Sequence, residues 1–149
     1  MNDDAARERA EVIALIALLA DAERDHGITG GIIACILRDQ SVESAHAIYD
    51  QVLAHRDSFI GIGLDSAERP FPPELFTDVF ARAGRDGFKR VAHAGEEGPA
   101  SFIWTALDTL GVDRIDHGVR AAEDEELIGR LAASDIALTV CPLSNVALK

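Results

Sequence analysis

The sequence predicts an α/β fold in which parallel strands alternate with helices that pack on them. Two hydrophobic periods alternate regularly along the 149 residues, and the strand-length runs are apolar on both faces. Two architectures repeat this unit, the open doubly wound sheet and the closed (β/α)8 barrel. The glycines of Gly61-Ile62-Gly63 lie inside a predicted strand rather than after one, so they do not form a dinucleotide-binding loop. The lack of such a loop favours the barrel.

The first part of the chain is expected to contain two helices and two strands. A helix is predicted over residues 4–24, where apolar residues recur at helical spacing and Gly27 follows as a stop. The continuous apolar run 28–37 predicts the first strand, and residues 59–64 predict the second. Ser41 is expected to cap the helix between them. The inner face of that helix is the set Ala45, Ile48, Tyr49, Val52 and Leu53.

The same alternation continues to the end of the chain. Prolines open two of the remaining helices, and acidic residues in the first turn favour a third. Linkers, low-complexity tracts and charge blocks are missing, so residues 1–149 are predicted to form a single domain. The remaining elements, in order, are a helix from Pro72, a strand at 88–92, a helix from Pro99, a strand at 114–116, a helix at 123–133 and a strand at 136–140.

The composition excludes several classes of partner. With 14 Lys and Arg against 26 Asp and Glu, the formal charge of −12 would repel phosphate backbones and anionic lipid. The longest apolar run, residues 12–20, is about half a membrane span and follows acidic residues. Cys35 and Cys141 are too few and too far apart for a disulfide scaffold, and Cys35 is expected in the core. We therefore expect a cytoplasmic protein with no nucleic-acid partner and no membrane association.

Polar side chains follow four of the predicted strands. Residues 65–68, 93–97, 116–118 and 141–145 carry carboxylates, imidazoles and amides directly after strands two to five. The carboxyl ends of parallel strands gather on one face, and in barrels that face carries the active site. These segments are therefore expected to converge on a catalytic rim.

The residue types on this rim favour metal-assisted hydrolysis. A neutral imidazole such as His93 is a suitable Zn²⁺ ligand, and Glu96 is near enough in sequence to move a proton beside the metal. His117 is a second imidazole that could orient the attacking oxygen. A zinc site requires three or more protein ligands, so these residues alone do not complete one. A structural reading stays open for Asp65 and Glu68, which are also placed to cap the following helix.

Three segments resemble the adenosine and adenine deaminase family. They occur in the family's order, and the resemblance extends from about residue 28 to the last residue. Within the family, the segment 63–68, Asp116 and the segment 138–140 are more similar to the adenine deaminases. The matching segments are His93-Ala94-Gly95-Glu96 followed by Glu97-Gly98-Pro99, Arg114-Ile115-Asp116-His117-Gly118-Val119, and Cys141-Pro142-Leu143-Ser144-Asn145-Val146.

The resemblance implies a zinc-dependent TIM barrel that converts adenine to hypoxanthine and ammonia, with one Zn²⁺ per complete enzyme and a small-molecule purine as substrate. It implies that His93 is a zinc ligand and that Glu96 donates a proton to the ring nitrogen beside the attacked carbon. It further implies that His117 orients the attacking oxygen. Asp65 and Ser66 match the family's substrate-contact loop.

The chain also departs from the family pattern. It contains neither the His-x-His pair of the first strand nor the Asp-Asp pair of the last, both of which the family uses at its site. Five predicted strands, against eight in a closed barrel, indicate an incomplete barrel of about five βα units that resembles family strands three to seven. We expect this segment by itself to be inactive. Two alternatives remain, an adenosine deaminase of the same family and a catalytically inactive truncated fragment.

Overall fold

A computed structural model describes residues 3–147 and shows five parallel strands in one sheet. The spatial order is β1-β2-β3-β4-β5, so every strand pairs with its neighbour in the sequence. A doubly wound sheet reverses its strand order at a switch point, whereas a barrel does not. The order therefore agrees with the predicted arc of a barrel. The strands are β1 Ile33–Leu37, β2 Gly61–Asp65, β3 Lys89–Ala94, β4 Arg114–His117 and β5 Ala137–Thr139.

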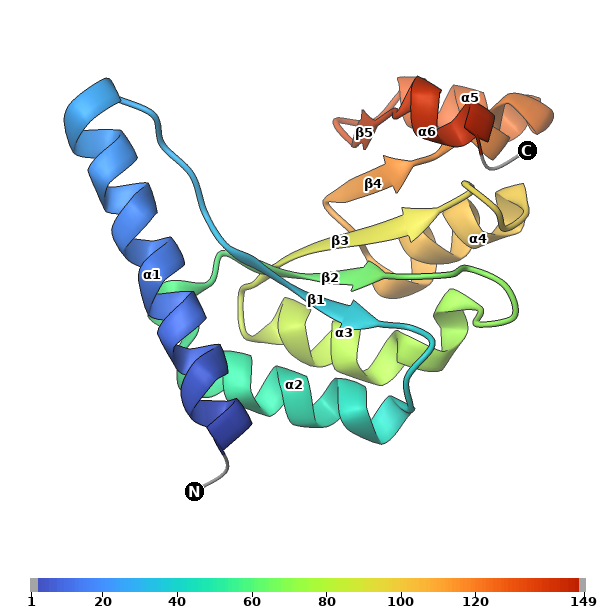
Figure 1. Cartoon of the computed structure of the whole chain (residues 1–149). Helices are drawn as coiled ribbons and strands as arrows, with labels where there is room; N and C mark the ends of the chain where they lie inside the picture. The colour runs from blue at the N-terminus through green and yellow to red at the C-terminus, as the bar shows by residue number, and fades with distance from the viewer. Residues whose placement is uncertain (1–2, 148–149) are drawn as a thin grey trace.

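Helices connect the strands, as predicted, and α2 and α3 lie on the same side of the sheet (Figure 1). Among the described residues, no helix is both long enough and apolar enough to cross a membrane. The α-helices are α1 Asp3–His26, α2 Val42–Ala54, α3 Thr77–Arg85, α4 Ala100–Thr105, α5 Glu125–Ala132 and α6 Pro142–Ala147. Short helical turns are η1 Arg56–Ser58, η2 Pro73–Phe76, η4 Val119–Glu123 and the π-helical η3 Ala106–Leu110.

The observed elements differ from the predicted ones mainly at their ends. Strand β1 begins at Ile33 rather than at residue 28, because Gly30 and Gly31 form a segment that passes close to other parts of the chain. A Cβ atom on Gly31 would lie 2.6 Å from the side chain of Ile60. Strands β3 and β4 extend further than predicted, so the two histidines of the rim belong to the strands themselves. Helix α6 was not predicted.

The core lies between the sheet and the helices. Tyr49 of α2 and Phe80 of α3 are fully buried, and Ser41 caps α2 by accepting a hydrogen bond from the backbone of Ser44. The opposite face of the sheet is more open, and Cys35 and Leu37 of β1 are exposed there. The expectation that Cys35 lies in the core is therefore wrong, because alternate side chains of a strand point to opposite faces.

Candidate active site

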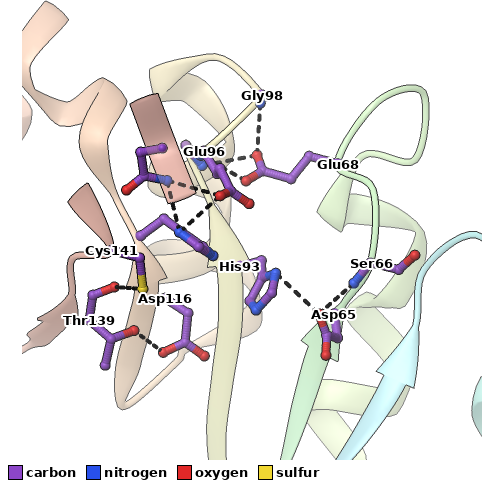
Figure 2. A network of polar contacts seen from close by, with 12 residues as sticks. Asp65, Ser66, Glu68, His93, Glu96, Gly98, Asp116, Thr139 and Cys141 are labelled. Atoms are coloured by element: carbon purple, nitrogen blue, oxygen red, sulfur yellow. Dashed lines mark hydrogen bonds and ion pairs between the residues drawn. The ribbon is translucent and has the colours of Figure 1, made fainter. Parts of the chain in front are cut away.

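The carboxyl ends of β2, β3 and β4 bring polar side chains together at one edge of the sheet (Figure 2). The register pairs His93 of β3 with Asp116 of β4, and Ala94 with His117. Because the strands are parallel and in chain order, their ends lie side by side without further adjustment. The predicted convergence of the rim segments is confirmed for these three strands.

Three predicted residues form a compact cluster that could hold a metal ion. One ligand atom from each of His93, Glu96 and His117 lies within 4.8 Å of the other two. The two imidazole rings meet edge to face, with centroids 4.8 Å apart and planes at 87°. Two imidazoles and a carboxylate are a donor set that catalytic zinc sites use. The cluster therefore fits a transition metal better than a hard, oxygen-preferring cation.

Asp65 contacts His93 on the Nδ1 side of the ring. Its Oδ1 atom is 3.2 Å from Nδ1 of His93, so the Nε2 atom on the other side of the ring stays free of this contact. The same carboxylate oxygen accepts a hydrogen bond of 2.7 Å from the backbone N–H of Ser66, which has a φ of 76°. Histidine ligands of metals usually donate their second ring N–H to such a carboxylate, which orients the ring. The geometry thus places Asp65 against an imidazole rather than at a helix cap.

Glu68 holds the loop that carries Glu96. Its side chain is almost fully buried, and its two oxygens accept hydrogen bonds from the backbone N–H groups of Gly95, Glu96 and Gly98 at 3.0, 2.8 and 3.0 Å. The following helical segment has no side-chain cap, so the expectation that Glu68 caps it is wrong. A Cβ atom on Gly98 would lie 2.3 Å from Glu68 Oε2, so the carboxylate fits only because this position is glycine.

Glu96, His117 and Asn145 contact one another at the centre of the site. Oε1 of Glu96 is 3.2 Å from Nδ1 of His117. The side-chain Nδ2 of Asn145 is 2.9 Å from the first atom and 3.1 Å from the second. The side chains of His117 and Glu96 are only 10% and 13% exposed, so these polar contacts are made largely out of water. Asn145 lies in the motif 141–146, but the sequence alone predicted no role for its side chain.

Arg38 is a second residue that the sequence analysis missed. It directly follows β1, is fully buried, and donates from Nη2 to the backbone carbonyl of His93 at 2.9 Å. Burial lowers the pKa of the guanidinium, whereas the charges of Glu68, Asp65 and Glu74 act in the opposite direction. Arg38 could have been identified from the sequence, because it directly follows a predicted strand. The other polar segments of the rim were identified by their positions after strands.

Asp116 lies beside this cluster but is tied to other residues. Its carboxylate accepts hydrogen bonds from Nε of Arg114 at 2.9 Å and from the hydroxyl of Thr139 at 2.5 Å. Burial by itself would raise the pKa of Asp116, but these two hydrogen bonds, together with the charges of Arg114 and His93, outweigh burial, so the pKa lies below its ordinary value. Asp116 is therefore an ionised side chain fixed between β4 and β5.

Outside this edge, His46 makes a local contact between helices. Nδ1 of His46 in α2 is 3.1 Å from Nη1 of Arg82 in α3. Arg82 also pairs with Asp50 at 2.5 Å and lies over the ring of Tyr49. This group connects α2 with α3.

The chain is similar in sequence and in structure to proteins named adenine deaminase. An adenine deaminase from Bordetella avium is 56% identical over 133 residues, which are 89% of this chain and 42% of the relative. The crystal structure of adenine deaminase from Arthrobacter aurescens superposes with a TM-score of 0.83 at 53% identity, over 87% of this chain and 40% of that one. An amidohydrolase from Burkholderia ambifaria with bound Zn gives a TM-score of 0.81 at 41% identity, over 87% of this chain and 36% of its own.

These comparisons also define how much of such a protein the chain represents. It spans about two fifths of the length of the relatives that it matches. The family model described as adenosine deaminase matches residues 8–149, which is nearly the whole chain. The match to this model and the identities above show that the chain belongs to the adenosine deaminase family.

Proposed function

We propose that this chain forms part of a zinc-dependent adenine deaminase, which hydrolyses adenine to hypoxanthine and ammonia. The observation that carries the proposal is the cluster of His93, Glu96 and His117 at the carboxyl edge of the sheet. The high identity to proteins named adenine deaminase favours adenine as substrate. Because the chain spans about two fifths of these relatives, it supplies only part of the active site.

His93 is the proposed metal ligand, through Nε2. Its Nδ1 atom faces Asp65, which leaves Nε2 as the nitrogen available to a cation. The zinc bound in the Burkholderia ambifaria neighbour supports the choice of metal, and we propose one ion per complete enzyme. Bound zinc would lower the pKa of water toward about 7 and so supply a nucleophile at neutral pH.

Glu96 and His117 are the proposed catalytic residues. Glu96 donates a proton to the ring nitrogen next to the carbon that carries the amino group, which makes that carbon more electrophilic. His117 orients the attacking oxygen through the ring nitrogen that faces away from Glu96. The oxygen of water bonds to the carbon, the bond from carbon to the amino nitrogen breaks, and that nitrogen leaves as ammonia. One hydrogen of the water goes to the leaving nitrogen, and the other restores the proton of Glu96. The reaction balances as adenine plus water giving hypoxanthine plus ammonia.

Asp65 and Ser66 are the proposed substrate-binding residues. Both lie at the end of β2, next to the histidine cluster, and Asp65 is within 3.2 Å of His93. The left-handed backbone of Ser66 turns the chain sharply at this point. Asp65 would therefore serve two purposes, because the carboxylate that contacts the purine also orients His93.

The cytoplasm is the proposed location, and residues 1–149 are proposed to lie in one domain. Cys35 and Cys141 are both free and exposed. Burial of part of the Cys35 side chain, together with the charges of Asp65 and Asp116, raises the pKa of its thiol. Free exposed thiols are typical of proteins in a reducing compartment.

A chimera tests the proposed function. Residues 28–149 would replace the matching segment of the Arthrobacter aurescens adenine deaminase, which supplies the remaining strands. The chimera is expected to deaminate adenine, measured as the loss of adenine absorbance and the release of ammonia. Turnover of adenosine in preference to adenine would favour the alternative, an adenosine deaminase.

The variant Glu96→Gln of the chimera tests the proposed role of this residue. It is expected to retain zinc, measured by metal analysis, and to lose about 10²–10⁴-fold in turnover, because glutamine cannot donate the proton. Glu97→Gln, in the same loop, is the matched control and is expected to stay active. Loss of zinc together with activity in Glu96→Gln would instead make Glu96 a metal ligand.

A further inference from the structure

The buried amide of Asn145 lies between the two proposed catalytic residues. We propose that Asn145 is a positioning residue that keeps the transferable proton of Glu96 on Oε2, the carboxylate oxygen that faces neither Asn145 nor His117. This inference rests on the proposed function, since it assigns Glu96 the part of proton donor. It goes further because it states which oxygen carries the proton and which residue decides it.

Nδ2 of Asn145 contacts both proposed catalytic residues. Nδ2 of Asn145 has two hydrogens, and it is 2.9 Å from Oε1 of Glu96 and 3.1 Å from Nδ1 of His117. These two acceptors are themselves only 3.2 Å apart. An NH₂ group has one hydrogen for each of these atoms, and we assign the acceptor role to Nδ1 of His117 as well as to Oε1 of Glu96, so that no hydrogen lies between those two atoms.

The orientation of the amide follows from its surroundings. The opposite orientation would place Oδ1 of Asn145 against a carboxylate oxygen, which brings two acceptors together whenever Glu96 is ionised. In the observed orientation Oδ1 is buried and has no hydrogen-bond partner among the described residues. The site therefore accepts one unsatisfied oxygen in order to present both hydrogens of Nδ2 to Glu96 and His117.

Two consequences for proton positions follow. Oε1 of Glu96 accepts a hydrogen bond, so the acidic proton resides on Oε2. Nδ1 of His117 also accepts a hydrogen bond, so the neutral ring carries its hydrogen on Nε2. When Glu96 acts, the Oε2–H bond breaks, an N–H bond forms at the purine ring nitrogen, and the carboxylate keeps the electron pair.

Without Asn145, the proton would have a competing position. Oε1 and Nδ1 of His117 are close enough for a direct O–H···N hydrogen bond. A proton held there would face away from the substrate and would also reverse the tautomer of His117. The amide prevents this internal hydrogen bond, because it occupies both acceptors at once.

The side chain of Asn145 reaches the site from α6. Asn145 is buried, whereas its neighbours Leu143 and Val146 on the same helix are exposed. Its backbone N–H donates to the carbonyl of Cys141 at 2.9 Å, which closes the first turn of the helix. Ser144 is the adjacent polar residue and is exposed, so Ser144→Ala is a matched control for changes to α6.

Nitrogen NMR of the histidine rings in the 149-residue chain tests the inference without any need for activity. The signals of His117 are assigned by their loss in His117→Gln, and the exposed His26 serves as an internal reference. At a pH at which the ring is neutral, His117 is expected to show an unprotonated Nδ1. In Asn145→Asp, which keeps the shape but replaces the donor by acceptors, Nδ1 is expected to gain the hydrogen. A protonated Nδ1 in the unaltered chain, which requires no variant to fold, would overturn the proposal.

Kinetics of the chimera supply the second readout. Asn145→Asp and Asn145→Ala are each expected to lower kcat by about 10–100-fold while KM changes little, because the proton is misplaced rather than the substrate released. Ser144→Ala is expected to leave both constants unchanged. Equal kcat in all of these enzymes would refute the inference. An inactive chimera with Asn145 intact would instead refute the proposed function, and the NMR result would still decide the part of Asn145.

Discussion

Two regions at the loop 95–98 differ in their contacts, the one around the Glu68 carboxylate and the one around the Glu96 carboxylate. The Glu68 carboxylate is almost fully buried and accepts three backbone N–H groups. The Glu96 carboxylate faces one amide and one imidazole, both through the same oxygen. Both oxygens of Glu68 are thus occupied by backbone donors, whereas the described side-chain contacts of Glu96 leave its Oε2 free.

Two glutamates 28 residues apart in the sequence therefore meet at one loop and make different contacts there. Glu68 determines where the backbone of Glu96 lies, and Glu96 is the proposed proton donor. The proposed site is thus supported by a buried charge that itself has no place in the reaction. Changes to the supporting charge should alter stability, whereas changes to the reacting group should alter turnover.

The largest effect on stability is expected from Glu68→Ala. Three backbone N–H groups would lose a charged acceptor in a buried place, which should lower the free energy of unfolding by about 3 kcal/mol. Urea unfolding of the 149-residue chain measures the change. Glu68→Gln is the matched variant, and it is expected to cost less because its amide oxygen still accepts hydrogen bonds. Equal stability of Glu68→Ala and the unaltered chain would show that the loop does not depend on Glu68.

A change to the loop itself should have a somewhat smaller effect. The Cβ atom of Gly98→Ala would lie 2.3 Å from Glu68 Oε2 and 2.4 Å from the ring of Phe102, so both must move, at a cost of about 2 kcal/mol. Gly129→Ala in α5 is the control, because its Cβ would contact nothing within 4 Å. That variant should stabilise the chain by about 0.5–1 kcal/mol through helix propensity. Thermal unfolding of both variants measures these changes. A neutral Gly98→Ala would contradict the close packing of Gly98 against Glu68 and Phe102.

The smallest effect is expected at Asp116, a third carboxylate whose donors are side chains. Its pKa is lower in the folded chain than its ordinary value of 3.8, so its ionised form stabilises the fold above that pH. This contribution is lost as the pH falls through the folded pKa. Asp116→Asn does not titrate, so it should be about 1 kcal/mol less stable than the unaltered chain at pH 7, and the difference should shrink as the pH falls below 3.8. A difference that grows toward acid pH would contradict the assigned direction.

The order of elements was predictable because it rests on local patterns. Each predicted strand and helix occurs, with shifts at the ends, since burial of apolar faces dominates the choice between strand and helix. The ends were less predictable, as β1 shows, because the close approach of Gly31 to Ile60 joins parts of the chain distant in sequence. Helix α6 is short and has largely exposed apolar residues, so its pattern carried little signal.

The sequence by itself determined the α/β class, the strand-end positions of His93, Glu96 and His117, and the family that their motifs resemble. Those features depend on residue types at short spacing, which a single chain displays directly. Only the tertiary structure decided the partners of Glu68, Arg38 and Asn145. Each of these side chains bonds to a residue at least 27 positions away, and such contacts arise only when parallel strands and their loops come together in space.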